Sequence, residues 1–206
     1  MWNTILDLIF PPRDEDVLVR SLAPEDIHQL LSPRLVESTI PSTISLLPYK
    51  RKRVKALIHE CKFYKNKKAT RLLAHALSSF LTEYVLDRVE LAGRNIVIVP
   101  TPLSLNRYKE RGYNQVANVT NIASKTCSLP HKHILAKIRH TKSQVALNRK
   151  DRLRNQRGAF MAEKVQRNTT YIVVDDVTTT GATLSATIEA LQKAGARHIV
   201  PIALAH

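Results

Sequence analysis

Two hydrophobic patterns alternate along the C-terminal half of the chain. Short, almost wholly apolar runs occupy residues 95–100 (NIVIVP), 171–176 (YIVVDD) and 198–204 (HIVPIAL), with a shorter one at 134–138 (ILAKI). Runs of this kind, ended by Pro or Asp, are typical of buried parallel strands. The segments between them, such as residues 114–124, place apolar side chains at helical spacing. This alternation predicts an α/β fold with a mostly parallel twisted sheet flanked by helices, whose ligands bind beyond the carboxyl ends of the strands.

The N-terminal half has a different pattern of apolar and polar residues. Residues 50–91 read as helices, because their apolar side chains recur every three or four positions, as Leu73, Leu77 and Leu81 do. Residues 1–45 are acidic and rich in proline, which favours a small appendage with short helices. We therefore predict an appendage over residues 1–45 and a main domain over residues 46–206.

Length and composition limit the class of protein. A chain of 206 residues with 44% hydrophobic residues suits one globular domain with a real core. No apolar run approaches the roughly 20 residues that cross a bilayer, and the apolar start contains Asp7 without a basic flank, so we expect a cytoplasmic protein with no membrane insertion. Cys61 and Cys127 stand alone, and the histidines form no HExxH motif, so neither a disulfide framework nor an intrinsic zinc site is expected.

The net charge of +15 is concentrated in two blocks. Residues 50–71 carry ten basic side chains against one acidic, and residues 104–167 carry fifteen against three. Charge concentrated in this way indicates a polyphosphate ligand, nucleic acid, or both. For the first block, a solvated outer face of an amphipathic helix is an equally good explanation.

The junction after the second apolar run carries the most specific chemistry. Asp175 and Asp176 end a buried strand, and TTTGAT opens a helix. Two neighbouring carboxylates can hydrogen-bond a ribose diol and help to hold Mg²⁺, whereas amides and hydroxyls at a helix N-terminus can bind a phosphate. The alternative is a capped helix after an ordinary turn. The candidate phosphate loop comprises Thr178, Thr179, Thr180, Gly181, Ala182 and Thr183.

The string DDVTTTGAT resembles the phosphoribosyl pyrophosphate signature of type I phosphoribosyltransferases. Two further segments, VPTPLSLNRYKERGYNQVAN at 99–118 and IRHTKSQVALNRKDRLRNQRGAF at 138–160, resemble blocks of the ComF family of competence proteins, as does the basic stretch around 57–63. The resemblance implies a type I phosphoribosyltransferase-like fold. It also implies that Asp175 and Asp176 are the catalytic residues that bind ribose and, through the ligand, Mg²⁺.

The same resemblance assigns the two basic loops. The loop after residue 100 occupies the place where type I enzymes bind pyrophosphate, and arginine suits the geometry of phosphate oxygens. A basic surface loop is the alternative, and Tyr108 and Tyr113 can either stack on bases or pack. Asn114 and Gln115 can either cap a helix or orient ligand. The candidate pyrophosphate residues are Thr101, Arg107, Arg111 and Gly112.

The second basic loop matches the place of the mobile loop that closes over the active site in type I enzymes. Closure would exclude water and bring cations to the departing pyrophosphate. A fixed nucleic-acid-binding face is the alternative. The candidate residues of this loop are Arg139, Gln144 and Arg152.

The chain departs from the resemblance at two places. Family members usually carry a cysteine-rich zinc module after an FPP-like start, but Phe10-Pro11-Pro12 is followed here by RDED, so we expect no zinc. Salvage enzymes for 6-oxopurines carry an Asp at the position of Thr179, and a threonine cannot act as a base at neutral pH, so that activity is disfavoured.

Two functions follow as hypotheses. The first is a Mg²⁺-dependent glycosyltransferase that binds phosphoribosyl pyrophosphate and transfers its ribosyl phosphate group to an unknown acceptor, in connection with DNA uptake and competence. The second is a non-catalytic DNA-uptake accessory protein that binds single-stranded DNA or a helicase-like competence ATPase through its basic surface. The sequence leaves the acceptor, turnover and the oligomeric state open.

Overall fold

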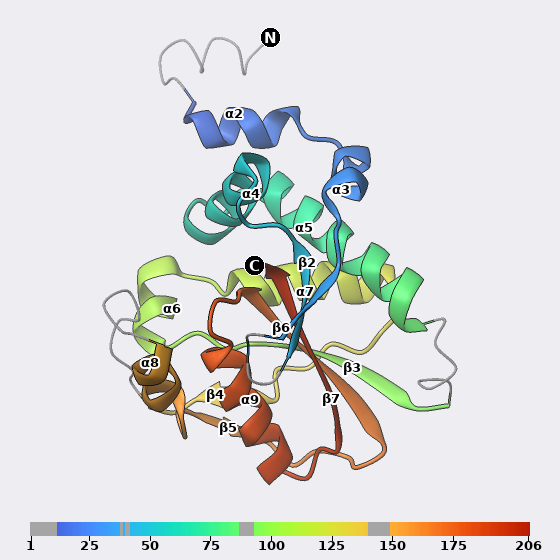
Figure 1. The fold of residues 1–206 in the computed structure, drawn as a ribbon, viewed down its shortest axis with the longest axis vertical. Helices are drawn as coiled ribbons and strands as arrows, with labels where there is room; N and C mark the ends of the chain where they lie inside the picture. Colours follow the sequence, from blue (N-terminus) through green and yellow to red (C-terminus); the bar gives the residue numbers. More distant parts are fainter. Residues whose placement is uncertain (1–11, 38, 40–41, 87–92, 140–148) are drawn as a thin grey trace.

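The computed structural model describes residues 12–37, 39, 42–86, 93–139 and 149–206 (Figure 1). These residues form a five-stranded sheet in the order β1-β2-β7-β6-β3. Only β1 is antiparallel to its neighbour. The mostly parallel sheet with flanking helices confirms the predicted α/β class. The strands are β1 (Arg34–Val36), β2 (Thr43–Leu47), β3 (Asn95–Pro100), β6 (Thr169–Val177) and β7 (His198–Ala205).

The register brings the carboxyl ends of the central strands together. Pro100 of β3 pairs with Val174 of β6, and Asp175 of β6 pairs with Ala203 of β7. The amide of Thr101 continues the ladder by donating to the carbonyl of Val174 at 2.9 Å. The residues that follow β3 and β6 therefore share one edge of the sheet, as the sequence predicts.

Helices cover both faces of the sheet. On one face, Ile98, Ile172 and Ile202 belong to a core shared with α4 (Lys52–Phe63), α5 (Lys67–Phe80) and α7 (Gln115–Thr126). The alternate strand residues face α9 and a small antiparallel sheet of β4 and β5, as expected from the two-residue period of strands. The remaining elements are η1 (Leu81–Leu86), α6 (Leu105–Arg111), α8 (Arg149–Gln156), α9 (Ala182–Lys193), β4 (Leu135–Lys137) and β5 (Phe160–Ala162).

The N-terminal segment is joined to the main body by both its strands and its helices. The expected boundary at residue 45 falls inside β2, which pairs with β7 in the central sheet. Val19 of α2 (Asp14–Ser21) and Ile27 of α3 (Pro24–Leu30) belong to the same core as Leu57. Residues 14–47 thus share their core and their sheet with the rest of the chain.

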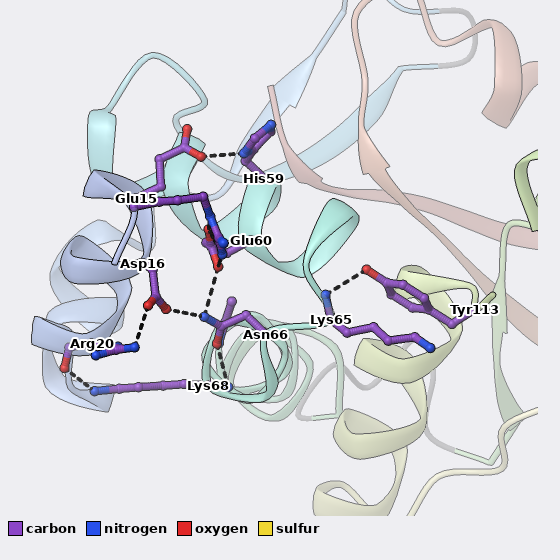
Figure 2. A network of polar contacts seen from close by, with 11 residues as sticks. Glu15, Asp16, Arg20, His59, Glu60, Lys65, Asn66, Lys68 and Tyr113 are labelled. Atoms are coloured by element: carbon purple, nitrogen blue, oxygen red, sulfur yellow. Dashed lines mark hydrogen bonds and ion pairs between the residues drawn. The ribbon is translucent and has the colours of Figure 1, made fainter. Parts of the chain in front are cut away.

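Polar contacts also attach α2 to the helices beneath it (Figure 2). The fully buried carboxylate of Glu60 accepts hydrogen bonds from Arg13 at 2.9 to 3.1 Å and from Asn66 at 3.1 Å. Asn66 also donates to Asp16 at 3.0 Å and caps the start of α5. A buried carboxylate needs such partners, because an uncompensated charge in the interior is costly.

Two basic segments contain helices that were not predicted from the sequence. The basic stretch expected as a loop after β3 contains α6, which Ser104 caps by accepting from the amide of Arg107 at 3.4 Å. The segment matching a mobile loop contains α8. The ILAKI run does form a strand, β4, but it pairs with β5 outside the central sheet. Within the described part of the chain, no helix is long and apolar enough to cross a membrane.

Candidate active site

An acidic pair ends β6 at the edge of the sheet. Oδ1 of Asp175 accepts from the hydroxyl of Thr101 at 2.8 Å and from the amide of Asp176 at 3.0 Å. Thr101 is buried directly after β3. The parallel pairing of β3 and β6 therefore orients Asp175 through a neighbour 74 residues away in sequence.

Asp176 has a denser set of partners. Its Oδ2 accepts from Nε2 of Gln115 at 2.8 Å and lies 3.0 Å from Nζ of Lys62, while its Oδ1 accepts from the amide of Val177 at 2.7 Å. Gln115, buried in the first turn of α7, therefore orients the acidic pair, while Asn114 caps the helix. The contacts confirm Asn114 as a helix cap, and the role of Gln115 in orienting ligand stays a prediction.

The two carboxylates have opposite protonation tendencies. Burial raises the pKa of Asp175, and the charge of Asp176 adds to that rise. Burial acts in the same direction on Asp176, but the charge and hydrogen bond of Lys62, with the bonds from Val177 and Gln115, bring its pKa below the ordinary value. Asp176 therefore ionises more readily than Asp175.

The threonine loop follows the pair and starts α9. Gly181 adopts φ 75° and precedes the first residue of α9, a backbone conformation that favours glycine. The buried hydroxyl of Thr178 has no hydrogen-bond partner among the described residues. All six loop residues surround a small hollow of about 20 Å³, and Thr179 and Thr183 also line the adjoining cleft. The structure therefore brings the predicted phosphate loop together at the foot of that cleft.

The cleft itself has a volume of about 350 Å³ and is bordered by both carboxylates and four cationic side chains. Arg107 and Arg111 of α6 lie on it, as does Thr101. Gly112 is not among its lining residues; with φ 72° it ends α6 and donates its amide to the carbonyl of Tyr108 at 2.7 Å. The four cations are Lys62, Arg107, Arg111 and Lys137.

The small β4–β5 sheet adds Lys137 and Phe160 to the cleft. Lys137 donates to Oε1 of Gln156 at 3.1 Å, and its Nζ lies 5.1 Å from the centre of the Phe160 ring. Burial lowers the pKa of Lys137 to about 8, and repulsion from Arg107 contributes. Neither Lys137 nor Phe160 was among the site residues predicted from the sequence, although Phe160 ends the 138–160 segment.

Of the three candidate mobile-loop residues, the structure describes the side chain of Arg139 alone. Arg139 donates to the carbonyls of Asn155 at 3.0 Å and Arg157 at 2.7 Å, so it connects the start of this segment to its end. It is not among the residues that line the cleft. Gln144 lies outside the described residues. Arg152 lies within α8, and its side chain is also outside what the structure describes.

The two tyrosines beside α6 differ in exposure. Tyr113 is 9% exposed, and its hydroxyl donates to the carbonyl of Cys61 at 2.7 Å and accepts from the amide of Lys65 at 3.1 Å. Tyr108 is 52% exposed. Tyr113 therefore packs, while Tyr108 presents its ring at the surface.

The donor set suits a magnesium ion that arrives with a phosphate ligand. Among the described residues, no three His, Cys, Asp or Glu side chains are grouped to hold a metal ion. Mg²⁺ commonly binds one or two carboxylates and takes its other oxygens from substrate phosphates and water. Asp175 and Asp176 are the two carboxylates of the cleft that would hold such an ion from the protein side.

Comparisons with known proteins were made on both sequence and structure. No protein-family model matches the chain. Competence protein F of Haemophilus influenzae is 35% identical over 106 residues, 50% of this chain and 46% of that protein. Competence protein ComFC of Streptococcus pneumoniae is 30% identical over 133 residues, 65% and 56% of the two chains. DNA utilization protein YhgH of Escherichia coli is 31% identical over 143 residues, 68% and 61% of the two chains.

The chain thus spans between 46% and 61% of the length of these curated relatives. Among solved structures, the adenine phosphoribosyltransferase of Thermoanaerobacter pseudethanolicus aligns with a TM-score of 0.33 at 12% identity, covering 89% of this chain and 99% of that chain.

Proposed function

Since this chain belongs to the ComF family of competence proteins, we propose that it binds phosphoribosyl pyrophosphate with Mg²⁺ in the cleft at the end of β6. One observation carries the proposal: an acidic pair, a threonine loop at a helix start and four cations border one cleft. A phosphorylated sugar with a pyrophosphate group needs these three kinds of partner together.

The threonine loop is assigned to the 5′-phosphate. The positive end of the α9 dipole and the amides of the loop favour an anion there. The buried and unpartnered hydroxyl of Thr178 offers a donor to such an anion. Binding a phosphate would satisfy this hydroxyl, which otherwise costs free energy in the interior.

The acidic pair is assigned to the ribose hydroxyls, and α6 to the pyrophosphate. Arg107 and Arg111 present guanidinium groups to the cleft, where phosphate oxygens can accept bidentate hydrogen bonds. When bound with the ligand, Mg²⁺ would stabilise negative charge on the pyrophosphate oxygens. Asp175 and Asp176 would hold it from the protein side.

In the transfer reaction, the bond between C1 of the ribose and the pyrophosphate oxygen breaks, and pyrophosphate leaves with the electron pair. The acceptor then forms a bond to C1 through an oxocarbenium-like transition state. The residues of this chain contribute position and electrostatic stabilisation rather than covalent chemistry. Thr179 offers no carboxylate to the acceptor, so an acceptor that arrives already deprotonated suits this cleft better than a 6-oxopurine.

Calorimetric titration of the wild-type protein with phosphoribosyl pyrophosphate, with and without Mg²⁺, tests the binding. We expect saturable binding that Mg²⁺ strengthens, and weaker binding of ribose 5-phosphate, which keeps the 5′-phosphate but lacks the pyrophosphate. If neither compound binds at any metal concentration, the assignment of the cleft is wrong.

We also propose that the protein acts in DNA uptake or utilisation by contacting single-stranded DNA, with docking to a helicase-like ATPase as the alternative use of the same surface. The supporting observation is the number of exposed cations on α4, on α5 and directly before α4. They include Arg51, Lys52, Arg53, Lys55, Lys67, Lys68 and Arg71.

Exchanging Arg51, Lys52 and Lys67 for Gln should weaken single-stranded DNA binding uniformly across sequences. Each lost phosphate contact reduces the slope of log affinity against log salt by about 0.7, so the triple variant should lose about 2. Fluorescence anisotropy with a labelled oligonucleotide over a salt series measures the slope. An unchanged slope would exclude this surface as the DNA contact.

A further inference from the structure

Lys62 is a cleft cation that contacts the acidic pair. Its Nζ lies 3.0 Å from Oδ2 of Asp176, and its side chain is 24% exposed while that of Asp176 is 14% exposed. It comes from the last turn of α4, which precedes every segment assigned to the ligand. A partly desolvated pair of this kind is less screened by water and salt than a surface pair.

The lone pairs of the two carboxylates are unequally occupied. Oδ2 of Asp176 accepts from both Lys62 and Gln115, and Oδ1 of Asp175 accepts from both Thr101 and Asp176. The contacts of Asp175 named above are made by Oδ1, whereas Oδ2 of Asp176 is held by Lys62 and Gln115. At Asp176, a divalent cation must therefore compete with the ammonium group of Lys62.

The last turn of α4 is held in place from two sides, as Figure 2 shows. The hydroxyl of Tyr113 bridges the carbonyl of Cys61 and the amide of Lys65, one residue before and three after Lys62. On the other side, Glu60 is fixed by Arg13 and Asn66. Because these contacts hold the backbone on both sides of Lys62, the last turn of α4 is fixed where the Lys62 side chain can reach Asp176.

We propose that Lys62 is a resident cation that competes with divalent metal ions for Asp176, so that the site takes up a metal ion together with its pyrophosphate ligand rather than alone. A free divalent ion is repelled by Lys62 and finds only two protein carboxylates as ligands. A metal ion that is already bound to pyrophosphate has oxygen ligands from that group, and the negative charge of the pyrophosphate offsets the repulsion from Lys62. The part of this inference that concerns the ligand rests on the proposed function.

Binding of Mn²⁺ alone tests the competition without any phosphate ligand. Replacing Lys62 by Met should tighten Mn²⁺ binding about tenfold, a change of about 1.4 kcal/mol. Electron paramagnetic resonance of free Mn²⁺ measures the affinity. Lys62→Arg should behave like the wild type, because it keeps the charge.

Lys65→Met is the matched control. It removes the same charge from a position three residues on, where Nζ lies 5.0 Å from the centre of the Tyr113 ring and outside the cleft lining. Its Mn²⁺ affinity should stay at the wild-type value. Equal Mn²⁺ affinity in folded Lys62→Met and wild-type protein would overturn the proposal, as would equal tightening in Lys65→Met.

A second arm uses phosphoribosyl pyrophosphate. In Lys62→Met, the ratio of the affinity with Mg²⁺ to the affinity without it should rise, because the metal replaces the missing charge beside Asp176. A packing defect would weaken both affinities equally and leave the ratio unchanged, which would count against the proposal. If no variant binds this compound, the proposed function fails, while the Mn²⁺ measurement still decides the role of Lys62.

Discussion

Replacing Asp176 by Asn should reduce the affinity for phosphoribosyl pyrophosphate about 10- to 100-fold. A hydrogen bond to a charged group contributes about 1.5 to 3 kcal/mol, and the change removes the carboxylate that ionises more readily. Lys62, Gln115 and Val177 all direct N–H groups at this side chain. The NH₂ group of an asparagine is itself a donor, so it cannot accept all of these hydrogen bonds. Calorimetric titration in the presence of Mg²⁺ measures the loss.

Asp175→Asn should give a loss of the same order, and the double variant should abolish measurable binding. Asp14→Asn serves as the control, because this exposed carboxylate in the first turn of α2 does not line the cleft. Circular dichroism should show the same helix content for all the variants. Wild-type affinity in folded Asp176→Asn protein would remove the acidic pair from the ligand site.

The second large effect concerns stability. Replacing Arg13 by Met should lower the free energy of unfolding by about 3 kcal/mol, at the low end for a broken buried pair because Arg13 is 48% exposed. The substitution leaves the fully buried carboxylate of Glu60 with Asn66 as its remaining side-chain partner among the contacts described. It also removes the guanidinium that stacks 3.5 Å from the centre of the Tyr64 ring. Urea unfolding followed by circular dichroism measures the change.

A double-mutant cycle with Glu60→Gln separates the pair from other effects of the substitution. The double variant should be less destabilised than the sum of the single variants, because neither charge is left buried alone. Arg51→Met, an exposed arginine at the start of α4, is the control and should change stability by less than about 0.5 kcal/mol. Additive effects in the cycle would mean that the pair contributes nothing specific to the attachment of α2.

The Arg13 prediction concerns how the N-terminal segment is attached to the rest of the chain. The sequence resembles a family in which a zinc module usually follows the start of the chain, and cysteines are missing at that place here. In the structure, the described residues of 13–66 share a core and the Glu60 network. Burial and a bidentate ion pair therefore attach this segment, and the absence of zinc stays a prediction.

Local signals in the sequence were sufficient for much of the site. Asp175, Asp176 and the threonine loop adjoin in sequence, and a strand running into a helix positions them without distant help. The strands β3, β6 and β7 were predictable from a different local signal, because each is a short, mostly apolar run. α6 was missed because its charged sequence buries no residue and depends on the caps at Ser104 and Gly112.

The alternation of strands and helices, the acidic pair and the loop that follows it can be read from the sequence, because they depend on side-chain period and on adjacent residues. The distant groups that line the candidate site are brought there by tertiary packing. Lys62 meets Asp176 across 114 positions of the chain, and Lys137 enters from a separate small sheet. Such partners depend on how helices pack on the sheet, and a lysine that pairs with a buried carboxylate has the same sequence signature as one that faces water.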